Sequence, residues 1–142
     1  MEDKRRVSVL IPFKIRQGKI LVYLQKRSKD APRLPDYFGF FGGGIEGNET
    51  SEEALRREIK EELDFTPIKY DFLGNYEFSD VMYAYILEVD DDFEKGIKIL
   101  EGEYGKFFSK ENVLNEPKLI ETDKLVLEHF YMFLEKTVEN LV

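Results

Sequence analysis

Residues 43–65 read GGIEGNETSEEALRREIKEELDF, which predicts a glycine-rich turn that opens into a helix. Thr50 and Glu53 form a T-x-x-E capping box, so the helix is expected to begin after Thr50 and to run to about Leu63. Residues three and four apart share a helix face, which places three carboxylates together: Glu58, Glu61 and Glu62. Because like charges at this spacing repel, the pattern favours a cation among them, and oxygen ligands favour Mg²⁺, or Mn²⁺ in its place.

The same window has the form G-x5-E-x7-R-E-I-x-E-E-x-D-F, which resembles the Nudix box. The fixed positions are Gly43, Glu49, Arg57, Glu58, Ile59, Glu61, Glu62, Asp64 and Phe65. The Nudix pattern has glycine where this chain has Asp64, and every other fixed position matches. Asp tolerates the left-handed conformation that a glycine adopts just past a helix, so we expect this departure to affect the helix end and not the chemistry.

The resemblance implies a metal site built on the box glutamates. The implied ligands are Glu58, Glu61 and Glu62, together with Glu46, Glu49, Glu101 and a main-chain oxygen near Gly42. In this family the arginine at the position of Arg57 orients the metal-binding carboxylates. By spacing alone, Arg57 would form an ordinary surface ion pair with Glu53 or Glu61, four residues away on either side.

The segment before the helix predicts a place where a ligand can approach the main chain. Phe40 and Phe41 are typical of a buried strand end, and Gly42, Gly43 and Gly44 predict a turn without side chains. A phosphate or a metal could reach backbone atoms there, so Gly43 and Gly44 are candidate substrate-binding residues.

A second region, residues 101–109, reads EGEYGKFFS. It resembles the E-G-x-x-G loop of the mutator-type branch of the family, in which the glutamate is a metal ligand and a candidate general base. That glutamate corresponds to Glu101, with Glu103 as the alternative, and both could instead lie in a solvated turn. The candidate catalytic residues are therefore Glu61, Glu101 and Arg57.

Other candidates have weaker support. Arg27 ends a predicted strand where relatives place a phosphate-binding arginine, and Asn115 lies in an N-E-P tripeptide that resembles a purine-reading one, although each could be structural. His129, the single histidine, is expected to pack or to face solvent. Four strand aromatics could stack on a base or belong to the core: Phe38, Phe40, Tyr83 and Tyr85.

Composition restricts the class of protein. The 142 residues fit one domain, residues 1–142, with 42% hydrophobic side chains for a core. The net charge of −8 argues against a grip on long DNA or RNA. There is no cysteine, which excludes disulfides and thiolate chemistry and is compatible with a cytoplasmic location. The start of the chain is interpreted as a strand rather than a signal peptide, and no apolar stretch is long enough to span a membrane.

Hydrophobic patterning predicts an α/β fold. Strands are expected at 7–16, 19–26, 38–41, 68–77, 81–89 and 105–109, with a hairpin at Gln17-Gly18, loops at 28–37 and 90–94, and a closing helix from Thr122 to about Glu139. This order resembles the Nudix α/β/α sandwich, in which a mixed sheet lies between helices.

The expected function follows from the resemblance. It is Mg²⁺-dependent hydrolysis of a nucleoside diphosphate linked to a group X, foremost a (d)NTP or 8-oxo-dGTP cleaved to the monophosphate and pyrophosphate. Dinucleoside polyphosphates, nucleotide sugars and a non-catalytic nucleotide sensor are the alternatives. The expected partner is a small nucleotide, with no long nucleic acid and no membrane, and the sequence leaves open whether the chain is a monomer or a homodimer.

Overall fold

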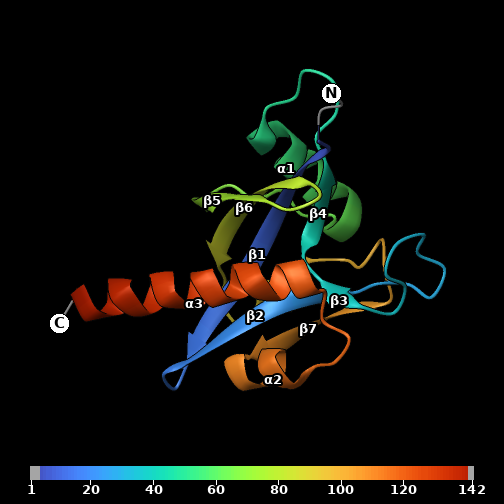
Figure 1. Cartoon of the computed structure of the whole chain (residues 1–142). Helices are drawn as coiled ribbons and strands as arrows, with labels where there is room; N and C mark the ends of the chain where they lie inside the picture. Colours follow the sequence, from blue (N-terminus) through green and yellow to red (C-terminus); the bar gives the residue numbers. More distant parts are fainter. Residues whose placement is uncertain (1–3, 141–142) are drawn as a thin grey trace.

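A mixed β-sheet lies between helices in the computed structural model, which describes residues 4–140 (Figure 1). The strands are β1 (Arg6–Arg16), β2 (Lys19–Lys26), β3 (Phe38–Gly39), β4 (Phe41–Gly44), β5 (Asp71–Glu77), β6 (Val81–Glu88) and β7 (Tyr104–Ser109). The helices are α1 (Ser51–Leu63), α2 (Lys110–Asn115) and α3 (Glu121–Asn140), with a 3₁₀ turn at Phe93–Gly96. The predicted α/β class is confirmed.

Strand β1 organises the sheet. It pairs in parallel with β6 along one side, and on the other side it pairs antiparallel first with β4 and then with β2. The register places Val9 opposite Gly42 and Phe13 opposite Val22. Strand β2 continues to β3 and β7, and β6 continues to the edge strand β5. The glycine segment is therefore fixed against the centre of the sheet.

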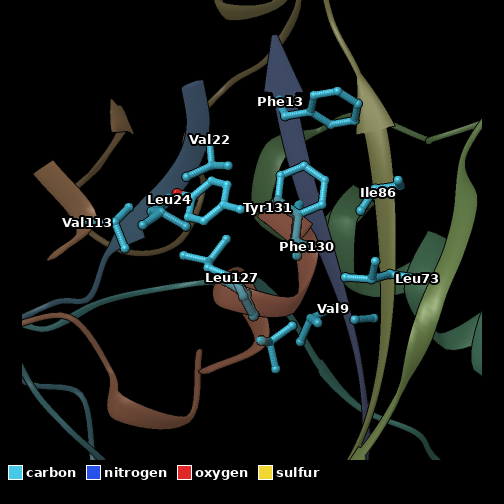
Figure 2. Close-up of a cluster of buried hydrophobic side chains, with 14 of the residues drawn as sticks. Val9, Phe13, Val22, Leu24, Leu73, Ile86, Val113, Leu127, Phe130 and Tyr131 are labelled. Carbon is cyan, nitrogen blue, oxygen red and sulfur yellow. The ribbon is translucent and has the colours of Figure 1, made fainter. Parts of the chain in front are cut away.

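Alternation along the strands supplies two hydrophobic cores. Val9 and Ile11 of β1 face α3, where they meet Leu127 and Phe130 (Figure 2). Leu10, between them in sequence, faces the opposite side and packs under α1. Both faces of β1 are buried, which explains its nearly continuous apolar sequence.

Helix α1 begins and ends as predicted. The Thr50 hydroxyl accepts from the Glu53 N–H at 3.1 Å, and the Glu53 carboxylate accepts from the Thr50 N–H at 2.9 Å. Asp64 takes the left-handed conformation (φ 51°, ψ 41°) at the C-terminus, and its side chain pairs with Lys60 at 2.7 Å. The aspartate therefore replaces the expected glycine without disturbing the helix end.

Several boundaries differ from the predictions. The segment Gly42–Gly44 is strand β4 rather than a turn, because β1 supplies a hydrogen-bonding partner, and the predicted strand 38–41 is divided between β3 and β4. Strand β5 begins at Asp71 rather than at residue 68. Helix α2 and the 3₁₀ turn are too short to give a periodic signal. Within residues 4–140, no helix is long and apolar enough to cross a membrane.

Candidate active site

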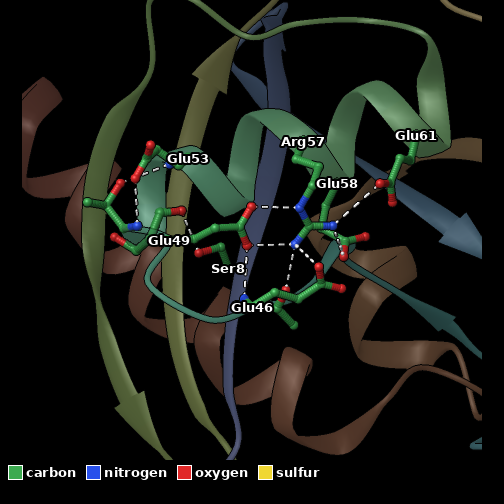
Figure 3. Close-up of polar contacts among 10 residues, drawn as sticks. Ser8, Glu46, Glu49, Glu53, Arg57, Glu58 and Glu61 are labelled. Carbon is green, nitrogen blue, oxygen red and sulfur yellow. Dashed lines mark hydrogen bonds and ion pairs between the residues drawn. The ribbon is translucent and has the colours of Figure 1, made fainter.

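Arg57 is the centre of the polar contacts on α1 (Figure 3). Its Nε and Nη2 donate to the two oxygens of Glu49 at 2.7 and 2.8 Å, and its Nη1 donates to Glu58 at 2.9 Å. Nη2 also donates to the main-chain oxygen of Gly44 at 2.9 Å. Weaker ion pairs reach Glu61 at 3.5 Å and Glu46 at 4.0 Å. One planar guanidinium thus holds helix α1, strand β4 and the intervening loop in fixed relation.

The charge of Arg57 is shared unequally among these carboxylates. Hydrogen bonds from Arg57, and one from the N–H of Glu46, lower the pKa of Glu49 to about 2. The same bond with Glu49 raises the pKa of Arg57 further. Burial instead raises the pKa of Glu58, although Arg57 opposes the rise. Glu49 and Arg57 therefore form a permanent ion pair, while the charged form of Glu58 is stabilised less by Arg57 than it is disfavoured by burial.

Glu62 lies deepest in the site. Only 5% of the residue is exposed, and its Oε1 accepts from the Gly42 N–H at 2.7 Å. Burial raises the pKa of Glu62 to about 8, and the charges of Glu58 and Glu101 act in the same direction. Glu101, forty residues away in sequence, therefore lies near both carboxylates, as its proposed role as a metal ligand requires.

Glycine is required in β4 for two separate reasons. Gly42 has φ 137°, and a Cβ there would lie 2.1 Å from the main-chain oxygen of Ser8 on β1. A Cβ on Gly43 would lie 2.5 Å from the carboxyl carbon of Glu58. Gly42 and Gly43 must therefore lack side chains, because β1 approaches the first and the Glu58 side chain of α1 approaches the second.

The donor set fits a divalent cation. Its ligating atoms are carboxylate and main-chain oxygens, which Mg²⁺ and Mn²⁺ prefer. Burial raises the pKa values of Glu58 and Glu62, and a bound cation would favour the charged form of both. Among residues 4–140, no three acidic, His or Cys side chains already converge on one point, since Arg57 draws several of the glutamates into ion pairs.

A cavity of about 620 Å³ adjoins this cluster on the α3 side of the sheet. The loop at 28–37, the turn at 78–80 and the N-terminus of α3 surround it, and Gly42 and Gly43 form part of its wall. The bare strand β4 therefore separates the carboxylates from the cavity, and its main chain faces both.

Two of the charged side chains that line the cavity, those of Arg27 and Asp123, lie close to the carboxylate cluster or are deeply buried. Arg27 donates to the Arg33 main-chain oxygen at 2.9 Å and lies near enough to lower slightly the pKa of both Glu62 and Asp123. Asp123 is only 6% exposed and accepts from the Phe40 N–H at 3.0 Å. Burial raises the pKa of Asp123 to about 6, and the hydrogen bonds from Phe40 and Thr122 oppose the rise.

Some predicted residues lie elsewhere. Asn115 is exposed at the end of α2 and does not line the cavity. Phe38 packs in the core against Phe108, and Tyr83 and Tyr85 pack on the α1 side of the sheet. His129 forms a hydrogen bond with Tyr76 and takes no part in the site. Of the four aromatic candidates, only Phe40 lines the cavity.

The sequence interpretation missed several cavity residues. Asp123 could have been found, because it shares the apolar face of the closing helix with Val126, Leu127 and Phe130, where an acid is out of place. Tyr37 and Phe78 line the cavity from loops, where no periodic pattern indicates burial.

Comparisons with known proteins found a family model, curated relatives and solved structures that match this chain. The family model described as NUDIX domain matches residues 4–130. Nudix hydrolase 16, mitochondrial, from Arabidopsis thaliana is 37% identical over 86 residues, which cover 54% of this chain and 46% of that protein. Nucleoside triphosphatase NudI from Enterobacter sp. (strain 638) is 42% identical over 59 residues, 42% of this chain and 40% of that protein. The chain thus matches less than half the length of these curated relatives.

Solved structures share the fold at low identity. The NUDIX domain of Shewanella oneidensis NrtR complexed with ADP ribose has a TM-score of 0.74 at 16% identity, covering 94% of this chain and 90% of that one. A MutT NUDIX hydrolase from Burkholderia pseudomallei has a TM-score of 0.67 at 24% identity, covering 90% and 98%. At this level of identity the likeness extends to the fold alone.

Proposed function

This chain belongs to the Nudix family, and we propose that it is a Mg²⁺-dependent pyrophosphohydrolase of nucleoside triphosphates, including oxidised forms such as 8-oxo-dGTP. One observation carries the proposal: the carboxyl groups of Glu58 and Glu62 lie against the glycine segment of β4, whose main chain also walls a nucleotide-sized cavity. The reaction consumes water and releases a nucleoside monophosphate and pyrophosphate.

The carboxylates divide into metal ligands, a partner for Arg57 and a general base. Glu58, Glu61 and Glu62, with Glu101 nearby, would hold Mg²⁺, and Glu49 fixes Arg57, which in turn positions Glu58. When bound, Mg²⁺ supplies a Lewis acid that neutralises phosphate charge and makes water a better nucleophile. Glu101 would accept the proton of the attacking water, because it lies beside the cluster but is not tied to Arg57.

The cavity suits a nucleoside. Its volume of about 620 Å³ is in the usual range for small-molecule sites, and Tyr37, Phe40 and Phe78 offer aromatic surface for a base. Asp123 offers a buried oxygen that would accept an N–H of the base edge, and Arg27 would contact a phosphate between the base and the carboxylates. The name of the NudI relatives, nucleoside triphosphatase, supports the same substrate class.

A turnover assay tests the proposal. Purified protein is incubated with dNTPs, 8-oxo-dGTP, diadenosine polyphosphates, ADP-ribose and nucleotide sugars, in Mg²⁺ or in EDTA, and the nucleotide products, phosphate and pyrophosphate are quantified. We expect Mg²⁺-dependent pyrophosphate release from triphosphates, and a loss of at least about 100-fold in kcat for Glu61→Gln. Turnover of nucleotide sugars or ADP-ribose alone would contradict the substrate class, and no turnover by folded protein would contradict the enzyme.

A further inference from the structure

Two ion pairs that share one aspartate lie in the lining of the cavity, outside the carboxylate cluster. One oxygen of Asp80 faces two guanidinium groups, Nη1 of Arg5 at 3.6 Å and Nη1 of Arg33 at 3.8 Å. All three residues line the cavity, and they come from three segments: the start of the chain, the loop at 28–37 and the turn at 78–80. The arginine side chains are 53% and 63% exposed, whereas that of Asp80 is 26% exposed.

Arg5 also lies beside the bare strand. A Cβ on Gly44 would lie 3.3 Å from Nη2 of Arg5, whereas a Cβ on Gly43 would lie against the Glu58 carboxylate. Successive residues of a strand face opposite sides. The guanidinium of Arg5 and the carboxylate of Glu58 therefore flank neighbouring residues of β4 from its two faces. The pairing of Val7 with Gly44 holds Arg5 close to this position.

We propose that Arg5 and Arg33 form a binding site for the phosphate groups that lie beyond the cleaved bond, and that Asp80 holds the two arginines until those groups displace it. This inference rests on the proposed function and narrows its substrate, since it requires the group beyond the cleaved bond to be a chain of phosphates and not a sugar phosphate.

The physical basis is a competition between anions. Distances of 3.6 and 3.8 Å exceed those of charge-assisted hydrogen bonds, so a single oxygen of Asp80 satisfies neither guanidinium. A terminal phosphate has three oxygens and close to two negative charges, and the guanidinium fork matches its geometry. Two arginines and one aspartate leave a net positive charge in a molecule whose net charge is −8.

An alternative is that Asp80 has only a structural role, in which its ion pair with Arg33 holds the loop at 28–37 against the turn at 78–80. The two interpretations predict opposite changes in the affinity for phosphate when the charge of Asp80 is removed. If Asp80 competes with phosphate, Asp80→Asn should strengthen phosphate binding; if Asp80 has only the structural role, the same change should weaken binding by loosening the site.

The test uses inorganic tripolyphosphate as the probe, titrated into the protein by calorimetry in EDTA at low ionic strength. Without divalent cations the carboxylates repel the probe, so the heat reports the arginine site. We expect Asp80→Asn to bind about threefold or more tightly than the wild type, and Arg5→Ala and Arg33→Ala each to bind about tenfold more weakly. Arg16→Ala, at the other end of β1 in an ion pair with Asp91, is the matched control and should bind like the wild type.

Circular dichroism and thermal melts establish that each variant is folded, and Asp80→Ser replaces Asp80→Asn if the latter is not. Absence of binding to the wild type, weaker or unchanged binding of the Asp80 variant, or an equal loss in Arg16→Ala would each overturn the proposal. The readout needs no turnover, so it is independent of the proposed function.

Kinetics provide the second measurement. Arg5→Ala should raise KM for a nucleoside triphosphate about tenfold while kcat changes little, because the residue would contact the phosphates beyond the cleaved bond equally in the bound substrate and in the transition state. An unchanged KM would overturn the inference while leaving triphosphate hydrolysis in place. Tripolyphosphate binding without hydrolysis of any triphosphate would support the arginine site and contradict the proposed function.

Discussion

Replacing Glu62 by glutamine is expected to abolish activity and at the same time to stabilise the fold. Glu62 is almost fully buried, and burial raises its pKa from an ordinary value of 4.5 to about 8. Glutamine keeps an oxygen that can accept from the Gly42 N–H but carries no charge. The variant therefore retains the main contact and avoids the cost of ionising a buried acid.

The magnitude follows from linkage. Because the pKa is raised in the folded state, the contribution of Glu62 to stability is fully present below about pH 4.5 and is lost as pH rises through 8. At about 1.4 kcal/mol per pH unit, wild-type protein at pH 7 loses up to about 3 kcal/mol that Glu62→Gln does not lose. The advantage of the variant should vanish near pH 4 and level off above pH 8.

Urea denaturation in EDTA between pH 4 and 9 measures this difference, with Glu128→Gln, an exposed glutamate of α3, as the control for loss of one charge. Added Mg²⁺ should stabilise the wild type by mass action and stabilise Glu62→Gln much less. A variant that is less stable than the wild type at pH 7, or a stability gain that does not depend on pH, would show that burial does not raise the pKa of Glu62.

Three further changes test other parts of the site. Asp123→Asn should raise the free energy of unfolding by about 3 kcal/mol at pH 7 to 8, since burial raises the pKa of Asp123 from 3.8 to about 6. Urea denaturation should show that this gain disappears as pH falls from 6 to 4. Arg57→Lys should reduce kcat/KM about 10- to 100-fold in the turnover assay without unfolding α1, because lysine cannot reproduce the forked contacts; an unaltered rate would remove Arg57 from the positioning role. Gly43→Ala should weaken Mn²⁺ binding at least about tenfold by displacing the Glu58 carboxylate, whereas Gly96→Ala, which meets no atom within 4 Å, should bind Mn²⁺ like the wild type.

Local chemistry explains what the sequence could predict. The capping box, the left-handed Asp64 and the shared face of the three glutamates depend on residues within a few positions of one another, and the structure has the helix as expected. The hairpin at Gln17 and Gly18 is similar, since both residues have positive φ.

Long-range pairing explains what the sequence could not predict. The glycine segment is a strand because β1 lies beside it, and nothing within Gly42–Gly44 indicates that partner. The cavity combines side chains from five separate segments, so Arg5, Arg33 and Asp80 gave no local signal. Asp123 was the exception, as an acid on an otherwise apolar helix face.

Carboxylates of α1 are proposed to hold a divalent cation against β4. Titration of ¹⁵N-labelled protein with Mn²⁺ tests this proposal directly, because the paramagnetic ion broadens amide signals near its binding site. We expect broadening to begin at Gly42–Gly44 and around Glu58 to Glu62, to spare the region of His129, and to be lost in Glu62→Gln. Broadening centred elsewhere, such as the acidic loop at 90–92, or an identical pattern in Glu62→Gln, would contradict the proposal.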